Sequence, residues 1–222
     1  MSIHPPLPFG AAIGDDEIWR QTLNRAMGPG RRPALFLDRD GVVVDEVNYL
    51  HRVEDVRLVD GVWEIISKAN ALSLAVVIVT NQAGIGRGHF GWEEFVAVQE
   101  AIIDGLAGQG AFVNAVYACP HHAEGKPPHD VADHEYRKPN PGMLLRAARD
   151  LPISLADSWI VGDRAGDIEA GRNAGLAGGL HILSGHGADD GERSAALALE
   201  ASAFSVRTGD TIAAAADLPL LG

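Results

Sequence analysis

Short, continuously apolar runs rich in β-branched residues alternate along this chain with segments of helical periodicity. The apolar runs cover residues 34–38, 74–79, 113–118, 158–163, 179–183 and 203–206. Helical patterns cover 62–72, 92–106 and 143–151, a segment through Ile168 and Ala174, and a short alanine-rich segment after the last apolar run. This alternation is typical of β-α-β units, and strands without polar alternation are buried on both faces. The pattern therefore predicts an α/β fold with a doubly wound, mostly parallel sheet.

The length of 222 residues suits one large domain, or one domain with an appendage. With 46% hydrophobic and 22% charged residues, the chain resembles folded globular proteins rather than disordered or fibrous ones. We predict a main domain over residues 33–222 and an N-terminal arm over residues 1–32. Within the arm, Ile18, Trp19, Leu23 and Met27 recur at helical spacing, which predicts a short helix.

The charge balance limits the classes of partner. Eighteen basic residues against thirty acidic ones give a net charge of -12, which disfavours binding to nucleic acid. The apolar run 74–79 is far shorter than the roughly 20 residues of a membrane span, and the first sixteen residues do not resemble a secretion signal. The single cysteine, Cys119, excludes an internal disulfide. We expect a cytoplasmic monomer with no membrane partner.

Polar residues follow three of the apolar runs at the point where each predicted strand ends. Asp38 and Asp40 follow the first run, Thr80 ends the second with Asn81 and Gln82 after it, and Asp163 ends a later one. In an open parallel sheet, ligands bind beyond the carboxyl ends of the strands. Each residue alone is typical of a helix cap or a turn, but their joint placement favours a ligand-binding site.

The clustered carboxylates would require a cation. Two unit charges about 4 Å apart repel by roughly 4 kcal/mol at an effective dielectric of about 20, so an anionic phosphate would be repelled as well. Hard oxygen ligands of this kind suit Mg²⁺. The strand ends therefore predict a magnesium site that faces an anionic substrate.

The motifs DRDG, TNQ, the lysine of RKP and GDRAGD occur in order over residues 33–185. This series resembles the haloacid dehalogenase superfamily of phosphotransferases. Within it, the segments FLDRDGVVVDEVNYLH, VVIVTNQAGIGRGHF, YACPHH, YRKPNPGML and VGDRAGD are similar to the D-glycero-D-manno-heptose 1,7-bisphosphate phosphatases, with the histidinol-phosphate phosphatases as close relatives. The resemblance implies a Rossmann-like fold and Mg²⁺-dependent hydrolysis of a small phosphorylated sugar, which makes residues 33–222 a phosphatase domain. The insertions between motifs are too short for a large cap domain.

The resemblance also implies a role for each motif residue. Asp38 would be the nucleophile that forms an aspartyl-phosphate, and Asp40 would be the general acid and base. Mg²⁺ would bind the carboxylates of Asp38 and Asp163 and the backbone carbonyl of Asp40. Arg164 would lie beside the ion without acting as a side-chain ligand, and Asp167 would lie further from it.

Thr80 and Lys138 would hold the transferring phosphoryl group, through a hydroxyl and a positive charge respectively. An ordinary turn at Thr80 and a solvated basic pair at Arg137 and Lys138 are the alternatives. Residues implied to bind substrate are Glu46, Val47, Asn48, Tyr49, Asn81, Gln82, Ala83, Arg137 and Lys138. The glycines of residues 84–88 predict a flexible turn, with Arg87 as an alternative contact for a remote phosphate.

Relatives carry a structural zinc held by a Cys-x-His pair and a Cys-x-Cys pair that flank the long loop 120–141. Cys119 and His121 match the first pair, but the second aligns to His134 and Tyr136. Candidates for a fourth ligand beside Cys119, His121 and His134 are His122, His129 and Asp133. The alternative is that histidines and prolines order this loop without zinc, with Cys119 as a small buried residue.

Two rival functions remain beside the heptose bisphosphate reaction. The first is hydrolysis of histidinol phosphate or another small phosphomonoester, which these motifs do not separate from the heptose reaction. The second is a non-catalytic sugar-phosphate sensor, suggested by the altered zinc ligands. The intact Asp38, Asp40, Lys138 and Asp163 argue against a sensor.

Overall fold

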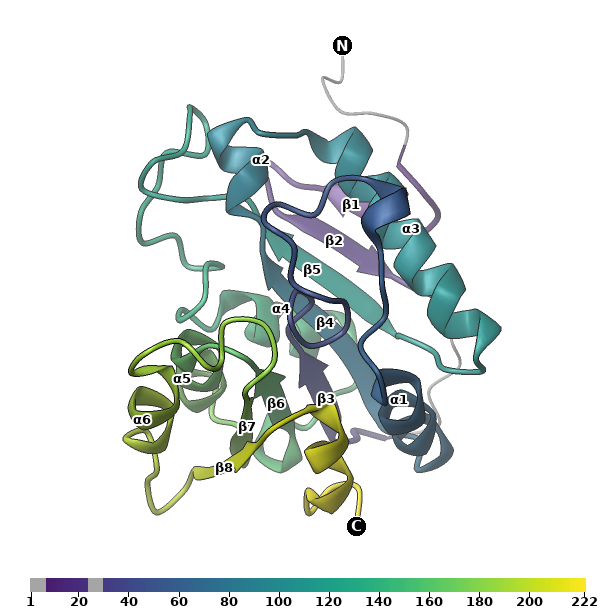
Figure 1. The fold of residues 1–222 in the computed structure, drawn as a ribbon, viewed down its shortest axis with the longest axis vertical. Helices are drawn as coiled ribbons and strands as arrows, with labels where there is room; N and C mark the ends of the chain where they lie inside the picture. Colours follow the sequence, from purple (N-terminus) through teal and green to yellow (C-terminus); the bar gives the residue numbers. More distant parts are fainter. Residues whose placement is uncertain (1–6, 24–29) are drawn as a thin grey trace.

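A single eight-stranded sheet forms the centre of the computed structural model, which describes residues 7–23 and 30–222. The strands lie in the order β1-β2-β5-β4-β3-β6-β7-β8 (Figure 1). Their bounds are β1 Ala11–Ile13, β2 Trp19–Thr22, β3 Ala34–Leu37, β4 Ala75–Asn81, β5 Ala115–Cys119, β6 Trp159–Gly162, β7 Gly178–Ile182 and β8 Ser205–Gly209. Strands β3 to β8 are mutually parallel, which confirms the predicted doubly wound α/β fold.

Helices cover both faces of the sheet, so two hydrophobic cores form. Helices α1 (Val62–Ala71) and α3 (Trp92–Gly108), with the 3₁₀ helix Ile212–Asp217, pack on one face. Helices α4 (Gly142–Asp150), α5 (Ala165–Asn173) and α6 (Glu192–Leu197) pack on the other. The described residues also form the short α2 (Ala83–Arg87) and the 3₁₀ turns Val53–Asp55 and Leu155–Asp157. Burial on both faces explains why strands β3 to β7 are largely apolar.

The short helix predicted from the spacing of Ile18, Trp19, Leu23 and Met27 is wrong. Its described part contains β2, which pairs antiparallel with both β1 and β5, and residues 24–27 lie outside the described residues. Ile18 and Trp19 are both fully buried, but they belong to the cores on opposite faces of the sheet. Adjacent side chains on opposite faces are a property of extended chain, and their spacing imitated a helical stripe. The β1–β2 hairpin therefore extends the main sheet.

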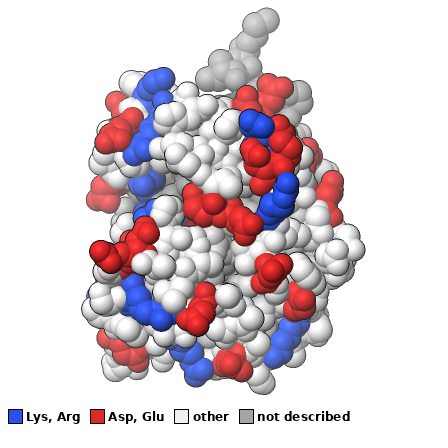
Figure 2. Space-filling model, viewed as in Figure 1, with Lys and Arg blue, Asp and Glu red and all other residues white. Residues whose placement is uncertain are grey.

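The surface of the described residues carries charges of both signs. Acidic and basic side chains are both present on the face shown in Figure 2. Among the described residues, no helix has the length and apolar character needed to cross a bilayer.

Candidate active site

The carboxyl ends of the central strands β4, β3 and β6 lie side by side and open into one cavity of about 540 Å³. This volume is within the usual range for small-molecule sites. Asp38 directly follows β3, Thr80 lies near the end of β4, and Asp163 directly follows β6. The backbone N–H of Asp38 donates to the carbonyl of Val161 at 3.0 Å, so pairing between β3 and β6 continues to the first residue of the site.

Three buried carboxylates form the floor of the cavity. Asp38, Asp163 and Asp167 each place an oxygen within 4.8 Å of the other two, and all three side chains are buried. Burial raises the pKa of Asp38 well above its ordinary value despite the nearby Lys138. Burial, followed by the charge of Asp167, raises the pKa of Asp163 to about 7. A concentration of carboxylate oxygens of this kind suits Mg²⁺.

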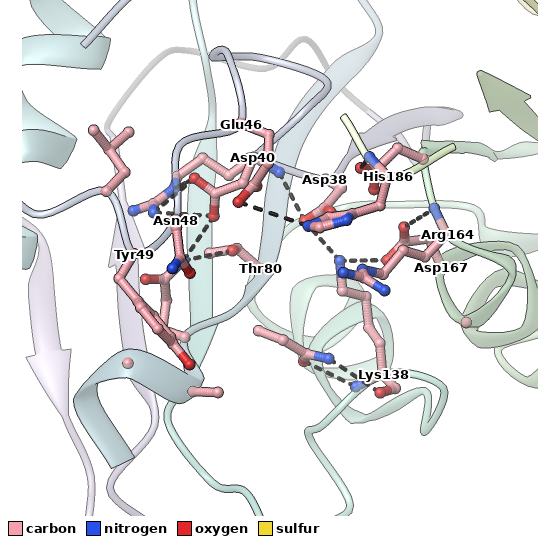
Figure 3. Close-up of a pocket in the computed structure, with 18 of the residues that line it drawn as sticks. Asp38, Asp40, Glu46, Asn48, Tyr49, Thr80, Lys138, Arg164, Asp167 and His186 are labelled. Carbon is pink, nitrogen blue, oxygen red and sulfur yellow. Dashed lines mark hydrogen bonds and ion pairs between the residues drawn. The ribbon is translucent and has the colours of Figure 1, made fainter. Parts of the chain in front are cut away.

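Lys138 lies between two of these carboxylates (Figure 3). Its Nζ is 2.8 Å from Asp38 Oδ1 and 2.7 Å from Asp167 Oδ1, and it donates to the carbonyl of Val79 at 2.8 Å. Burial opposes its charge, but Asp167 and Asp38 together raise the pKa of Lys138 above its usual value. Lys138 is therefore a fixed positive charge on the cavity floor rather than part of a solvated basic pair.

Asp40 is not part of the carboxylate cluster and has other partners. The buried guanidinium of Arg39 binds both of its oxygens, with Nη2 at 2.9 and 3.0 Å and Nε at 3.1 Å from Oδ1. Gln82 Nε2 lies 3.0 Å from Asp40 Oδ2 and 2.8 Å from the Thr80 hydroxyl. Gln82, predicted to bind substrate, thus uses its amide to connect Asp40 and Thr80. The contribution of Arg39 was missed because only side-chain geometry reveals it.

Gly41 allows two loops to approach closely behind Asp163. Gly41 has a φ of +80°, and a Cβ there would lie 2.6 Å from Asp163 Oδ2 and 3.0 Å from the Cα of Gly185. The loop after β7 also supplies His186, whose backbone N–H donates to Asp163 Oδ2 at 2.7 Å. Sequence reasoning missed His186, which lies outside every motif and in a loop without periodicity.

All nine residues predicted to bind substrate line this cavity, beside Asp38, Asp40, Thr80 and Asp163. Arg87, the alternative contact for a remote phosphate, also lines the cavity, as do His122, His186 and Glu192, which were not predicted as substrate contacts. The predicted flexible turn at residues 84–88 is wrong for residues 84–87, because residues 83–87 form α2. Arg87, at the end of α2, contacts the Tyr49 hydroxyl, lies 2.9 Å from Glu124 and meets His122 at 3.1 Å.

The three residues predicted to bind zinc do not converge on one point. The rings of His121 and His134 stack, with their centroids 3.8 Å apart and an angle of 3° between their planes. Burial raises the pKa of the Cys119 thiol to about 12. Among the described residues, the only group of three potential ligands within 4.8 Å is the carboxylate cluster.

Comparison with known proteins gives the chain its family. A family model described as HAD-hydrolase-like matches residues 135–199. A D-glycero-β-D-manno-heptose-1,7-bisphosphate 7-phosphatase from Mesorhizobium japonicum is 39% identical over 199 residues, which cover 89% of this chain and 88% of the relative. The chain belongs to the haloacid dehalogenase-like hydrolase family. This membership confirms the resemblance inferred from the motifs.

Solved structures of other haloacid dehalogenase-like proteins share the fold. A HAD-like phosphatase from Mesorhizobium loti aligns with a TM-score of 0.79 and 37% identity over 92% of this chain and 91% of that protein. A D,D-heptose 1,7-bisphosphate phosphatase from B. bronchiseptica, solved with magnesium and phosphate, aligns with a TM-score of 0.69 and 30% identity. The alignment covers 83% of this chain and 96% of that protein. The chain therefore covers nearly the whole length of both structures.

Proposed function

We propose that this chain is a Mg²⁺-dependent phosphatase that removes the 7-phosphate of D-glycero-D-manno-heptose 1,7-bisphosphate through an aspartyl-phosphate. The observation that carries the proposal is the arrangement of Asp38, whose buried carboxylate lies beside Lys138 and within a cluster of possible metal ligands. The heptose bisphosphate is proposed because relatives 36–40% identical to this chain carry that activity in their names.

Two donors orient the carboxylate of Asp38. The backbone N–H of Arg39 and the ammonium group of Lys138 both bind Oδ1 at 2.8 Å, which holds the carboxylate at the cavity floor. An Asp38 oxygen attacks phosphorus and forms the acyl phosphate while the bond from phosphorus to the sugar oxygen breaks. Lys138 and the Thr80 hydroxyl bind the phosphoryl oxygens, where negative charge concentrates.

Asp40 moves the protons in both halves of the reaction. Its carboxyl group gives a proton to the departing sugar oxygen, and the resulting carboxylate then takes a proton from the water that attacks the aspartyl-phosphate. Phosphate leaves, and both Asp38 and Asp40 return to their starting forms. Arg39 and Gln82 orient Asp40 beside Thr80, and therefore near the predicted phosphoryl position.

The donor set suits Mg²⁺ at the cavity floor. The carboxylates of Asp38 and Asp163 would hold the ion, with the backbone carbonyl of Asp40 as the third protein ligand. Asp167 is less suited to direct ligation, because Lys138 binds it at 2.7 Å and the backbone N–H of Arg164 binds its other oxygen at 3.0 Å. Bound Mg²⁺ would neutralise the carboxylates and stabilise the charge on the transferring phosphoryl group.

The outer part of the cavity has cationic groups for the rest of the substrate. Arg137 lines it, with Nη1 bound to the carbonyl of His121 at 2.9 Å. Burial lowers the pKa of Arg137, and the positive charges of Arg87 and Arg164 lower it further. These cations repel one another, so an anion such as a second phosphate would relieve the repulsion.

Phosphate release from both anomers of the heptose bisphosphate tests the proposal, with histidinol phosphate measured in parallel. The reactions are run with excess Mg²⁺ and again with EDTA, and Asp38→Asn protein is the control for contaminating phosphatases. We expect Mg²⁺-dependent turnover with the highest kcat/KM for one heptose anomer. A higher kcat/KM for histidinol phosphate would contradict the substrate, and the absence of turnover on both would contradict the catalytic proposal.

A further inference from the structure

Residues 120–141 form a long loop that ends in Arg137 and Lys138. Two of its histidines bind Arg137 through their backbones: the carbonyl of His121 accepts from Arg137 Nη1 at 2.9 Å, and the carbonyl of His134 accepts from the Arg137 N–H at 2.8 Å. The Arg137 side chain therefore depends on where His121 is held, and the Arg137 backbone depends on where His134 is held.

The imidazole rings of those two histidines pack face to face. The centroids of His121 and His134 are 3.8 Å apart and the ring planes differ by 3°, while His129 meets His121 edge-on at 5.5 Å. His121 is 4% exposed, and burial, followed by the charge of His121, lowers the pKa of His134. Burial of the stack therefore disfavours the charged form of the His134 ring.

The turn of the β1–β2 hairpin holds this stack from the other side. His121 Nε2 contacts the backbone carbonyl of Asp16 at 3.0 Å, and His129 Nε2 lies 3.4 Å from a carboxylate oxygen of Glu17. Arg20 pairs with the Asp16 carboxylate, which the Ile18 N–H also binds at 3.3 Å. Because β2 pairs with β5, this turn is fixed to the sheet directly beside the start of the loop.

The same residues do not fit the zinc site that the family resemblance implies. A metal ion lies in the plane of each imidazole ring that binds it, and two stacked rings with centroids 3.8 Å apart and nearly parallel planes do not share one ion. His121 Nε2 is already engaged by the Asp16 carbonyl. The fourth aligned position is Tyr136, a buried phenol rather than a thiolate.

We propose that His121 and His134, stacked on each other and held by the β1–β2 turn, form a zinc-independent brace that positions Arg137 for the substrate. His121 and His134 are positioning residues, because they act on substrate only through Arg137. The brace also gives the N-terminal hairpin a role in the site. The effect on substrate binding rests on the proposed function, whereas the independence from zinc does not.

Metal analysis of untagged protein tests the zinc-independence. The protein is purified with and without added zinc, dialysed against a zinc chelator and returned to Mg²⁺ buffer before thermal unfolding. We expect far less than one equivalent of zinc and an unchanged Tm after chelation. Close to one equivalent of zinc, together with a lower Tm after its removal, would overturn the proposal.

Two substitutions at His134 separate a ring stack from a metal ligand. His134→Phe keeps a ring that can stack but has no ligating nitrogen, and it loses only the 3.3 Å contact between Nδ1 and the Tyr136 N–H. His134→Ala removes the ring. We expect His134→Phe to retain the wild-type Tm and KM, and His134→Ala to lower Tm. Equal loss of Tm in both variants would contradict the brace.

The kinetic arm measures the positioning of Arg137. For the heptose bisphosphate, we expect His134→Ala to raise KM roughly tenfold with little change in kcat, about the effect of one charge-assisted hydrogen bond. For p-nitrophenyl phosphate, which has no second phosphate, KM should stay near wild type. In an Arg137→Ala background, His134→Ala should add little to the increase in KM.

Additive effects on KM, or equal losses on both substrates, would overturn the positioning role. If wild-type protein hydrolyses neither substrate, the proposed function fails, while the metal and stability results still decide the brace.

Discussion

Lys138 offers the sharpest test of the site, because its charge is buried between two carboxylates. Its side chain is 2% exposed, and its Nζ lies 2.8 Å from Asp38 and 2.7 Å from Asp167. At an effective dielectric of about 20, each contact corresponds to roughly 6 kcal/mol of Coulomb attraction, which desolvation largely offsets. Removal of one partner from a buried pair costs about 3–5 kcal/mol, because the remaining charge stays buried. We expect Lys138→Met to lower the free energy of unfolding by about this amount.

Urea and thermal unfolding in EDTA measure this loss. For a chain of 150–250 residues, about 2–4 °C of Tm corresponds to 1 kcal/mol, so the expected shift is roughly 6–20 °C. Lys68→Met is the matched control, because Lys68 is exposed on α1 and should change stability by less than about 0.5 kcal/mol.

A second substitution tests the electrostatic reason for the loss. Adding Asp167→Asn to Lys138→Met removes one of the two buried carboxylates that have lost their cationic partner. The double variant should therefore recover about 1 kcal/mol or more of the free energy of unfolding. Mg²⁺ should also stabilise Lys138→Met, because it supplies positive charge to the same cluster. A loss below about 1 kcal/mol in the single variant, or no recovery in the double variant, would refute this reasoning.

Four further predictions concern separate parts of the molecule. Asp38→Asn should abolish phosphate release and keep the circular dichroism of the folded chain, because an amide cannot replace the attacking oxygen; near-normal turnover would exclude the nucleophile role. Asp163→Asn should raise the Mg²⁺ concentration for half-maximal activity roughly tenfold or more, measured by Mg²⁺ titration after EDTA treatment; an unchanged titration would exclude Asp163 as a ligand. Trp19→Ala should destabilise the chain by about 3–5 kcal/mol in urea unfolding, because Trp19 is fully buried against Trp92 and Phe95; a loss typical of surface positions would mean that the hairpin is peripheral. On p-nitrophenyl phosphate, Lys138→Ala should lose far more kcat/KM than Arg137→Ala, and equal losses would contradict their different roles.

The sequence predicted the sheet and the floor of the site because both depend on short segments of chain. A buried parallel strand appears as a continuous apolar run, and the residue after it necessarily lies at the carboxyl end of the sheet. Asp38 and Asp163 could therefore be placed together from two such runs, and the structure does bring their carboxylates together.

The elements that were wrong or missed depend on contacts between distant segments. Ile18 and Trp19 had helical spacing with later apolar residues, and only pairing of β2 with β5 decides that this segment is extended. His186 binds Asp163 through its backbone N–H, a group that every residue except proline carries. No residue type marks such a contact in a sequence.

Arg137 and Lys138 are adjacent in the chain, but different forces hold their side chains. Lys138 is fixed by buried carboxylates that belong to the catalytic floor, so any change that displaces it also changes the reacting groups. The Arg137 side chain is bound by the carbonyl of His121 and its backbone N–H by the carbonyl of His134, both in a loop that the β1–β2 turn holds in place. Substitutions in the hairpin or the loop can therefore move Arg137 without disturbing the carboxylate cluster. This separation would allow the range of substrates in this family to change while the phosphoryl-transfer chemistry stays the same.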